Sequence, residues 1–269
     1  MKRLLIIANK KVFPSLDGGS LAIKNLAEKF SKLNYKIDLI AISKTNKNQS
    51  LSNSTASKVD KNIKQIVFYK SMSLNLIEFI KSIIYKSSYQ ANRFYHNDIQ
   101  KYIQNLININ KYQIILFESI FTTVYLKSLN LPKSVKIIFR AHNIEHEIWN
   151  NLAQKHFFRK IIYLFLAQQI KRLEQITPKY IDYIFTISNK DFNFFQQLFP
   201  KKTHNIPVTF DIENNQVKKI KNSIVHLGAM DWKPNLDGIE WFIKFVFPKI
   251  VQSEKYVNIY IAGKKMPEK

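Results

Sequence analysis

Residues 3–30, RLLIIANKKVFPSLDGGSLAIKNLAEKF, indicate the fold class most clearly. It opens with a continuous apolar run, which is typical of a strand buried on both faces of a parallel sheet. A polar turn with Gly18 and Gly19 follows, and from Ser20 to Leu33 apolar residues recur at the spacing of one helix face. A buried strand, a turn and an amphipathic helix predict the first unit of a parallel α/β sheet.

The same alternation continues along the chain. Further apolar runs predict strands at residues 36–43, 64–69, 113–118, 135–139 and 182–188. Helical patterns lie between them at residues 74–86, 94–109 and about 144–176. The sequence therefore predicts a parallel sheet with helices on both faces, and a polar exposed loop at residues 44–62.

A second, shorter domain is expected at the end of the chain. Residues 201–222 have the composition of a linker, after which a strand (223–230), a helix (234–250) and another strand (257–263) follow. We place the domains at residues 1–212 and 213–269. Because one and a half such units cannot bury a sheet on both faces, we expect the second domain to be incomplete.

Composition narrows the function classes. The 269-residue chain contains no cysteine, which excludes a disulfide framework, a thiolate zinc site and a cysteine nucleophile. Its net charge is +23, which has two possible explanations. One is a partner that carries phosphate or another polyanion, and the other is the lysine-rich composition that an AT-rich genome produces in any protein. The lysines are scattered along the chain and arginines are few, so we do not expect nucleic acid as a partner. No apolar run approaches the length of a membrane span.

The stretch RAHNIEHEIW (residues 140–149) matches the inverted zinc-peptidase pattern H-x-x-E-H through His142, Glu145 and His146. A zinc site of this kind needs both histidines on one helical face. His142 comes directly after the strand predicted at 135–139, so we expect the helix to begin near Asn143 or Ile144 and to leave His142 outside it. We therefore predict no metal site here.

Polar residues instead follow the ends of two predicted strands, where open α/β sheets bind their ligands. His142, Asn143 and Glu145 follow one strand, and Gly18–Ser20 open the helix that follows another. Paired glycines allow a ligand to approach the backbone, and the free N–H groups at a helix start attract phosphate. Two alternatives stay open: the glycines can form an ordinary tight turn, and His142 can be a hydrogen-bonded histidine of the core.

Several stretches together resemble one family. They are FPSLDGGSLAIKNLAEKF, RAHNIEHEIWNNLA, YIFTISNKD, and VHLGAMDWKPNLDGIEWFIKFVFPKI followed by IYIAG. In this order they resemble the GT-B glycosyltransferases of the family 4 type, in which two Rossmann-like domains face each other. The resemblance covers nearly the whole chain and implies a Rossmann-like GT-B N-terminal domain followed by the start of a second one.

The resemblance also implies an activity and roles for residues. The family transfers a sugar, as a hexosyltransferase does, from a nucleotide-sugar to an acceptor hydroxyl with retention at the anomeric carbon, and uses no cofactor or metal ion. His142 would be the catalytic-site residue nearest the sugar and acceptor. The expected binding residues are Gly18, Gly19, Ser20, Asn143, Glu145, Gly228 and Lys233. Lys233 would supply charge to the donor diphosphate, or else be an ordinary solvated lysine.

One departure from the family pattern bears on activity. The family's Glu-x7-Glu pair is missing, because no two glutamates lie eight positions apart. We therefore expect a fragment or a truncated relative, and a catalytically inactive or polyanion-binding α/β protein is the alternative function.

The expected partners follow from the family and from two stretches of the sequence. They are a nucleotide-sugar donor and a lipid-linked or saccharide acceptor for cell-surface polysaccharide. Residues 74–88 and 155–172 mix bulky apolar and basic side chains, which suits either core packing or an anionic membrane surface. The expected location is the cytoplasm, either free or peripheral on the inner face of the cell membrane.

Overall fold

The computed structural model describes residues 2–45, 52–209, 218–231, 233–253 and 256–266. The chain divides into two compact units, Met1–Phe210 and Asp211–Lys269. The domain boundary predicted after residue 212 falls within residues 210–217, outside the described residues. No helix within the described ranges is long and apolar enough to cross a membrane.

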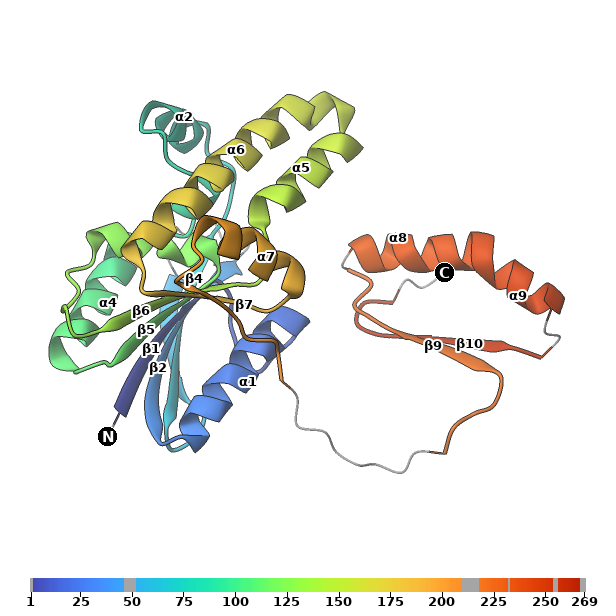
Figure 1. Ribbon diagram of the computed structural model, residues 1–269, viewed down its shortest axis with the longest axis horizontal. Coiled ribbons are helices and arrows are strands. Elements are labelled where there is room, and N and C mark those ends of the chain that lie inside the picture. The colour runs from blue at the N-terminus through green and yellow to red at the C-terminus, as the bar shows by residue number, and fades with distance from the viewer. Residues whose placement is uncertain (1, 46–51, 210–217, 232, 254–255, 267–269) are drawn as a thin grey trace. The chain divides into compact units, whose positions relative to one another are not determined.

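The first unit is built on an eight-stranded sheet (Figure 1). Its strands are β1 (Lys2–Ala8), β2 (Tyr35–Thr45), β3 (Ser52–Lys58), β4 (Ile63–Ser71), β5 (Ile114–Glu118), β6 (Lys136–Ala141), β7 (Tyr183–Thr186) and β8 (Thr203–Asn205). Their order is β3-β4-β2-β1-β5-β6-β7-β8, and every neighbouring pair is parallel except β3 with β4. The predicted parallel α/β sheet is confirmed.

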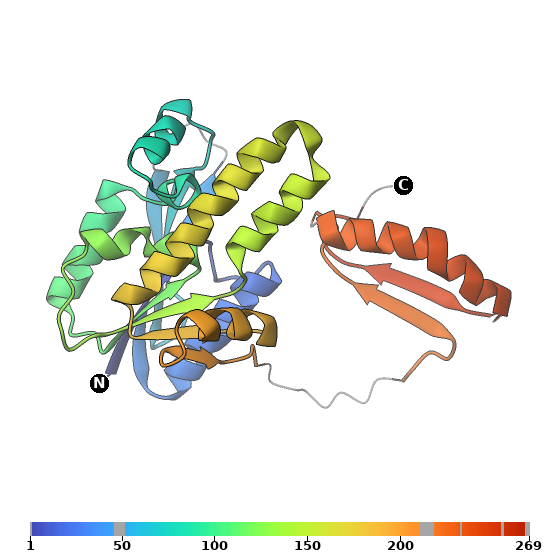
Figure 2. The same cartoon turned by 45° about the horizontal axis from the view of Figure 1, so that its top comes forward.

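Helices cover both faces of this sheet (Figure 2). They are α1 (Gly18–Lys32), α2 (Leu76–Ile84), α3 (Tyr89–Asn92), α4 (Asn97–Ile109), α5 (Glu145–Lys155), α6 (Lys160–Ile176) and α7 (Asn189–Leu198), with short 3-10 segments η1 (Ile120–Ser128), η2 (Phe157–Arg159) and η3 (Thr177–Tyr180). The alternating residues of β1 show why the strand is apolar throughout. Leu4 and Ile6 join the core that includes Ile23 of α1, whereas Leu5 and Ile7 join the core that includes Ile103 of α4.

Three sequence-based boundaries need correction. The loop predicted at 44–62 contains β3, and the linker predicted at 201–222 contains β8. Both are outer strands of the sheet that lack a long apolar run, so backbone pairing with β4 and β7 forms them without the pattern that marks a buried strand. The helical segment predicted at about 144–176 is divided into α5 and α6 by η2.

The second unit contains one strand–helix–strand motif in its described part. It comprises β9 (Ser223–Leu227), α8 (Lys233–Trp241), the π-helical turn η4 (Phe242–Val246), α9 (Phe247–Ser253) and β10 (Asn258–Ala262). The two strands pair in parallel, as the predicted strand–helix–strand pattern requires. Val225 and Leu227 of β9 are exposed, whereas Ile224 is partly covered, so only one face of this strand pair is packed.

Candidate functional site

The topology of the first unit creates a switch point between β1 and β5. From β1 the chain proceeds outward through β2 and β4 on one side, and later through β5, β6 and β7 on the other. Ligands of open α/β sheets bind at the carboxyl ends of the strands at such a point. Here β1, β5 and β6 end at Ala8, Glu118 and Ala141.

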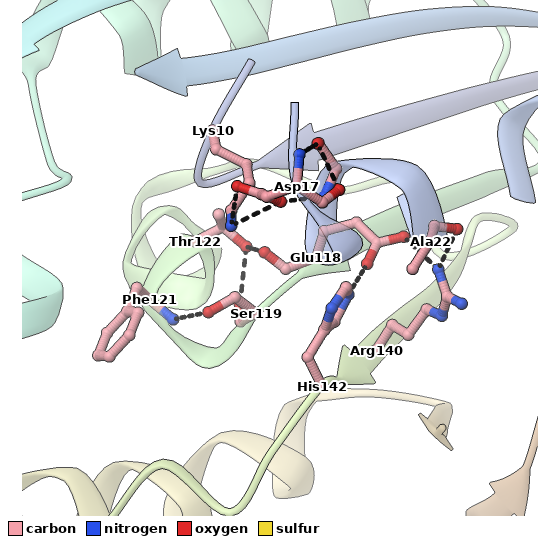
Figure 3. A network of polar contacts seen from close by, with 10 residues as sticks. Lys10, Asp17, Ala22, Glu118, Ser119, Phe121, Thr122, Arg140 and His142 are labelled. Atoms are coloured by element: carbon pink, nitrogen blue, oxygen red, sulfur yellow. Dashed lines mark hydrogen bonds and ion pairs between the residues drawn. The ribbon is translucent and has the colours of Figure 1, made fainter. Parts of the chain in front are cut away.

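Glu118 is the centre of a polar network at this edge (Figure 3). Its side chain is 0% exposed. The register of β5 and β6 sets Glu118 beside Arg140, whose Nη1 donates to Oε1 at 3.2 Å. The other carboxylate oxygen, Oε2, lies 2.5 Å from Nε2 of His142. Arg140 also donates from Nη1 to the backbone oxygen of Ala22 in α1 at 3.2 Å, so one network joins β5, β6 and α1.

The charge state of Glu118 fixes the orientation of His142. Burial would raise the pKa of Glu118, but the Arg140 cation and the hydrogen bond from His142 outweigh it and hold this pKa below its usual range. The carboxylate is therefore ionised at neutral pH, and Nε2 of His142 must carry the proton that it donates. No described residue hydrogen-bonds to Nδ1 of His142, and the side chain is 15% exposed, so Nδ1 remains for a ligand.

The backbone bends sharply directly after Glu118. Ser119 has a φ of +79°, a region that residues other than glycine adopt rarely. The bend is held by its N–H, which donates to the backbone oxygen of Arg140 at 3.1 Å, and by Thr122, whose hydroxyl donates to the backbone oxygen of Ser119 at 2.9 Å. Such conformations concentrate at functional sites, and this one turns the chain from β5 into η1.

The glycine turn forms the start of α1. Asp17 caps the helix: Oδ1 accepts from the N–H of Ser20 at 2.7 Å, and the hydroxyl of Ser20 accepts from the N–H of Asp17 at 3.0 Å. Ser20 is buried, and its hydroxyl also donates to the backbone oxygen of Asp17 at 2.9 Å. The structure therefore uses Ser20, expected to bind substrate, within the cap itself.

Lys10 adds a cation to this turn. Its Nζ lies 3.1 Å from Oδ2 of Asp17. Burial would raise the pKa of Asp17, but the hydrogen bond from Ser20 and the charge of Lys10 lower it. A side chain at Gly19 would meet Nζ of Lys10 at 3.0 Å, whereas nothing lies within 4 Å of the place where a Cβ on Gly18 would be. Gly19 therefore makes room for Lys10, and Gly18 leaves open space above the helix start.

The second histidine of the HNIEH stretch has a different partner from the first. α5 begins at Glu145, slightly later than the predicted start near Asn143 or Ile144, and His142 lies outside the helix as predicted. The fully buried Glu174 of α6 accepts from the N–H of Glu145 at 2.7 Å and bonds to Nδ1 of His146. His142 and His146 thus face separate carboxylates, and the described ranges hold no cluster of three metal-ligating side chains. His146 and Glu174 fix the start of α5.

Glu145 is a titratable group of this edge near neutral pH. Burial, followed by the charge of Glu174, raises its pKa to about 7, while a hydrogen bond from Asn143 and the charge of Lys10 oppose this. Because the charge of Lys10 lowers the pKa of Glu145, the glycine turn and the turn after β6 interact electrostatically. Asn143 is exposed. A half-buried carboxyl with this pKa can both hold and release a proton at physiological pH.

Gly228 and Lys233 belong to the second unit. The N–H of Gly228 donates to the backbone oxygen of Ala262 at 3.0 Å. A Cβ on Gly263, whose φ is +154°, would lie 1.7 Å from the backbone oxygen of Gly228, so this close turn requires glycine at 263. Lys233 is 77% exposed and its Nζ pairs with Oδ1 of Asp237 at 2.8 Å. This hydrogen bond raises the pKa of Lys233, which keeps the ammonium charged.

The first unit therefore gathers Gly18, Gly19, His142, Asn143 and Glu145 at one edge of its sheet. Sequence reasoning missed two members of the network, Glu118 and Arg140. A signal was present, because each is a charged residue at the end of an apolar run, in QIILFE and VKIIFR. A charge at the carboxyl end of a buried strand needs a partner, and the paired strand supplies it.

Comparison with known proteins bears on the fold. No family model matches the sequence. An uncharacterized 44.6 kDa protein in the cps region of Klebsiella pneumoniae is 22% identical over 275 residues, which is 98% of this chain. The chain spans 65% of that protein's length.

Solved structures share the fold at low sequence identity. TarM has a TM-score of 0.59 at 9% identity, covering 100% of this chain and 72% of its own. The catalytic domain of starch synthase IV from Arabidopsis thaliana, bound to ADP and acarbose, has a TM-score of 0.53 at 10% identity. The match covers 99% of this chain and 69% of the starch synthase chain. A trehalose-6-phosphate protein of E. coli bound with UDP-2-fluoro glucose has a TM-score of 0.52 at 13% identity. The match covers 98% of this chain and 65% of the E. coli chain. The chain has the Rossmann-like α/β fold of the GT-B glycosyltransferases.

Proposed function

We propose that this chain serves in a retaining glycosyltransferase of the family 4 type, which transfers a hexosyl group from a nucleotide-sugar to an acceptor hydroxyl. The observation that carries the proposal is the network in which the ionised, buried Glu118 holds His142 at the switch point of the sheet. Two structures of similar fold, bound to ADP and to UDP-2-fluoro glucose, support a nucleotide-sugar donor.

The proposed chemistry assigns a task to each group at this edge. Sugar transfer breaks the bond between the anomeric carbon and the diphosphate, forms a bond to the acceptor oxygen, and releases the acceptor proton. Nδ1 of His142 contacts a hydroxyl of the sugar or the acceptor. The N–H groups at the start of α1, beside Gly18 and Gly19, bind phosphate or acceptor oxygens, aided by Lys10.

The remaining predicted residues complete the proposal. Asn143 and Glu145 shape the turn, and the pKa of about 7 at Glu145 suits proton exchange with the acceptor. The turn that includes Gly228 and Lys233 contributes an ammonium group toward the donor diphosphate. No metal ion or cofactor takes part, since the nucleotide-sugar is a substrate and the cationic groups are those of the protein.

The cellular setting is part of the proposal. The relative in the cps region of Klebsiella pneumoniae supports a role in cell-surface polysaccharide synthesis. The acceptor is then a saccharide or a lipid-linked saccharide, and the enzyme acts in the cytoplasm, peripheral on the inner face of the cell membrane. Nucleic acid is not among the proposed partners.

The test uses the complete gene product, including whatever the reading frame encodes after Lys269. Radiolabelled UDP-, GDP- and ADP-sugars are incubated with cell lipid extract or with polysaccharide fragments. The proposal predicts that one donor labels one acceptor, with release of nucleoside diphosphate, with the donor's anomeric configuration kept in the product, and with an unchanged rate in EDTA. Transfer from none of the donors would contradict the proposed activity, inversion would exclude the retaining type, and loss of activity in EDTA would establish a metal requirement.

A further inference from the structure

Two neighbouring segments of the first unit expose large apolar side chains to water. On α2 these include Ile77, Ile80 and Ile84, and at the turn between α5 and α6 they include Phe157, Phe158 and Ile161. We call these six residues the apolar tip surface. Phe157 and Phe158 are 85% and 98% exposed. Large apolar side chains that are grouped on the surface of a folded protein can mark an interaction site.

This exposure is built into the fold, because α2 is anchored with its apolar side outward. Phe79 packs against Phe165 of α6 with ring centroids 5.8 Å apart. Ser82 is buried and accepts from Nε2 of Gln169 in α6 at 3.0 Å. Figures 1 and 2 both show α2 beside α6, and both show α2 and the α5–α6 turn on the same side of the first unit. The two contacts hold the opposite side of α2, so its isoleucines stay in solvent.

Basic residues flank the apolar tip surface, and the one acidic residue of α2, the exposed Glu78, is paired with Lys81. Between Asn151 and Leu173 the sequence contains five lysines and arginines and no acidic residue. Arg159 and Lys160 directly follow the two phenylalanines and are exposed, and Lys86 is exposed just after α2. Apolar side chains flanked by basic ones match the interface of a membrane with anionic headgroups, where the rings enter the acyl boundary and the cations meet phosphate.

We infer that the apolar tip surface docks this protein on an anionic membrane surface. The projecting turn inserts Phe157 and Phe158 at the headgroup boundary, α2 lies flat against it, and Arg159 and Lys160 contact the headgroup phosphates. A protruding convex turn reaches a bilayer plane without a matching groove in a partner. The inference rests on the membrane location proposed above, although binding itself does not require sugar transfer.

Co-sedimentation of the full chain with vesicles tests the inference. We expect binding to vesicles of phosphatidylglycerol mixed with phosphatidylcholine, weaker binding to phosphatidylcholine alone, and further weakening by salt. The double variant Phe157→Ser/Phe158→Ser should lower the partition coefficient roughly tenfold or more, because both rings lose their transfer free energy. Ile77→Ser/Ile84→Ser should lower it as well. The control Leu33→Ser/Ile109→Ser, matched to the isoleucine variant, removes apolar side chains of at least the same exposure elsewhere and should leave binding unchanged.

Three outcomes of the vesicle experiment would overturn the inference. Equal loss in the control variant would show non-specific adsorption, and equal binding to neutral vesicles would remove the role of the cations. A wild-type dimer that the phenylalanine variant converts to a monomer, with no vesicle binding by either, would assign the surface to a second copy of the chain. Sugar transfer to a water-soluble acceptor is measured separately. Its failure beside intact vesicle binding would contradict the proposed function and leave the docking surface in place.

Discussion

Glu118 interacts with Arg140 and His142, and these two partners have different roles. Arg140 is buried and also bonds to the backbone of α1, so its role is to neutralise the carboxylate and to join the elements. His142 is partly exposed, and its Nδ1 has no hydrogen-bond partner among the described residues. It is therefore the member of the network that can contact a ligand. At the residue scale, the site is therefore a buried ion pair that positions one partly exposed histidine.

The first prediction concerns the stability of this pair. Glu118→Gln leaves the Arg140 guanidinium buried without a counter-charge, which should lower the free energy of unfolding by about 3–5 kcal/mol. The matched control is Glu28→Gln, whose carboxylate is half-exposed and 3.8 Å from Lys24, and it should change stability by less than about 0.5 kcal/mol. Urea unfolding at neutral pH measures both. Equal, small changes would show that Glu118 does not neutralise Arg140.

The second prediction concerns Glu145 and pH. Its pKa of about 7 in the folded state exceeds the ordinary carboxyl value, so the protonated form stabilises the fold at low pH. That stability is lost as the pH rises from the ordinary carboxyl value through about 7, by an amount on the order of 3 kcal/mol. The unfolding free energy of the wild type minus that of Glu145→Gln should therefore fall between pH 5 and pH 8. A difference that does not vary with pH would contradict the assignment.

At the scale of elements, a substitution at the start of α1 can change ligand binding without lowering the stability of the fold. Gly18 adopts no positive φ and has open space around it, so the fold itself does not require glycine there. Gly18→Ala should keep the unfolding free energy or raise it by up to about 1 kcal/mol, because alanine favours the helix. It should nevertheless raise KM several-fold, because the methyl group stands where a ligand would approach the backbone.

A second glycine supplies the control for that experiment. Gly238 in α8 also has nothing within 4 Å of the place where an added methyl group would lie, so Gly238→Ala tests the helix effect alone. Steady-state kinetics should show an unchanged KM for Gly238→Ala. If Gly18→Ala also leaves KM unchanged, the glycine turn is a structural feature and does not bind substrate.

Elements with strong local patterns could be predicted from sequence, and those formed by pairing could not. The apolar runs identified β1, β2 and β4–β7 because such strands are buried on both faces. Ser52–Lys58 has no apolar run, so only its backbone bonds to β4 make it a strand. The same limit applies to the site. His142 was found by its place after a strand, whereas its bond to Glu118 spans 24 residues and depends on the register of β5 and β6.

At the scale of the whole molecule, basic residues outnumber acidic ones by 23, and the lysines are scattered along the chain. The net charge is +23, yet the carboxylates that matter are buried beside cations or histidines, as at Glu118 and Glu174. The surface carries exposed acidic residues such as Glu78 and Asp98, but lysine and arginine are in excess there and can meet phosphate, in a nucleotide or in a lipid headgroup. One charge distribution can thus serve both proposed partners of the protein.

The most direct measurement is the transfer rate of the complete gene product carrying His142→Ala. The proposal predicts that kcat falls about 100-fold, because the ring that contacts the reacting groups is lost. His204→Ala, which removes an exposed histidine of β8, should keep the wild-type rate. Circular dichroism establishes that both variants are folded. A His142→Ala enzyme that transfers sugar within about threefold of the wild-type rate would contradict the assignment of the active site to this edge of the sheet.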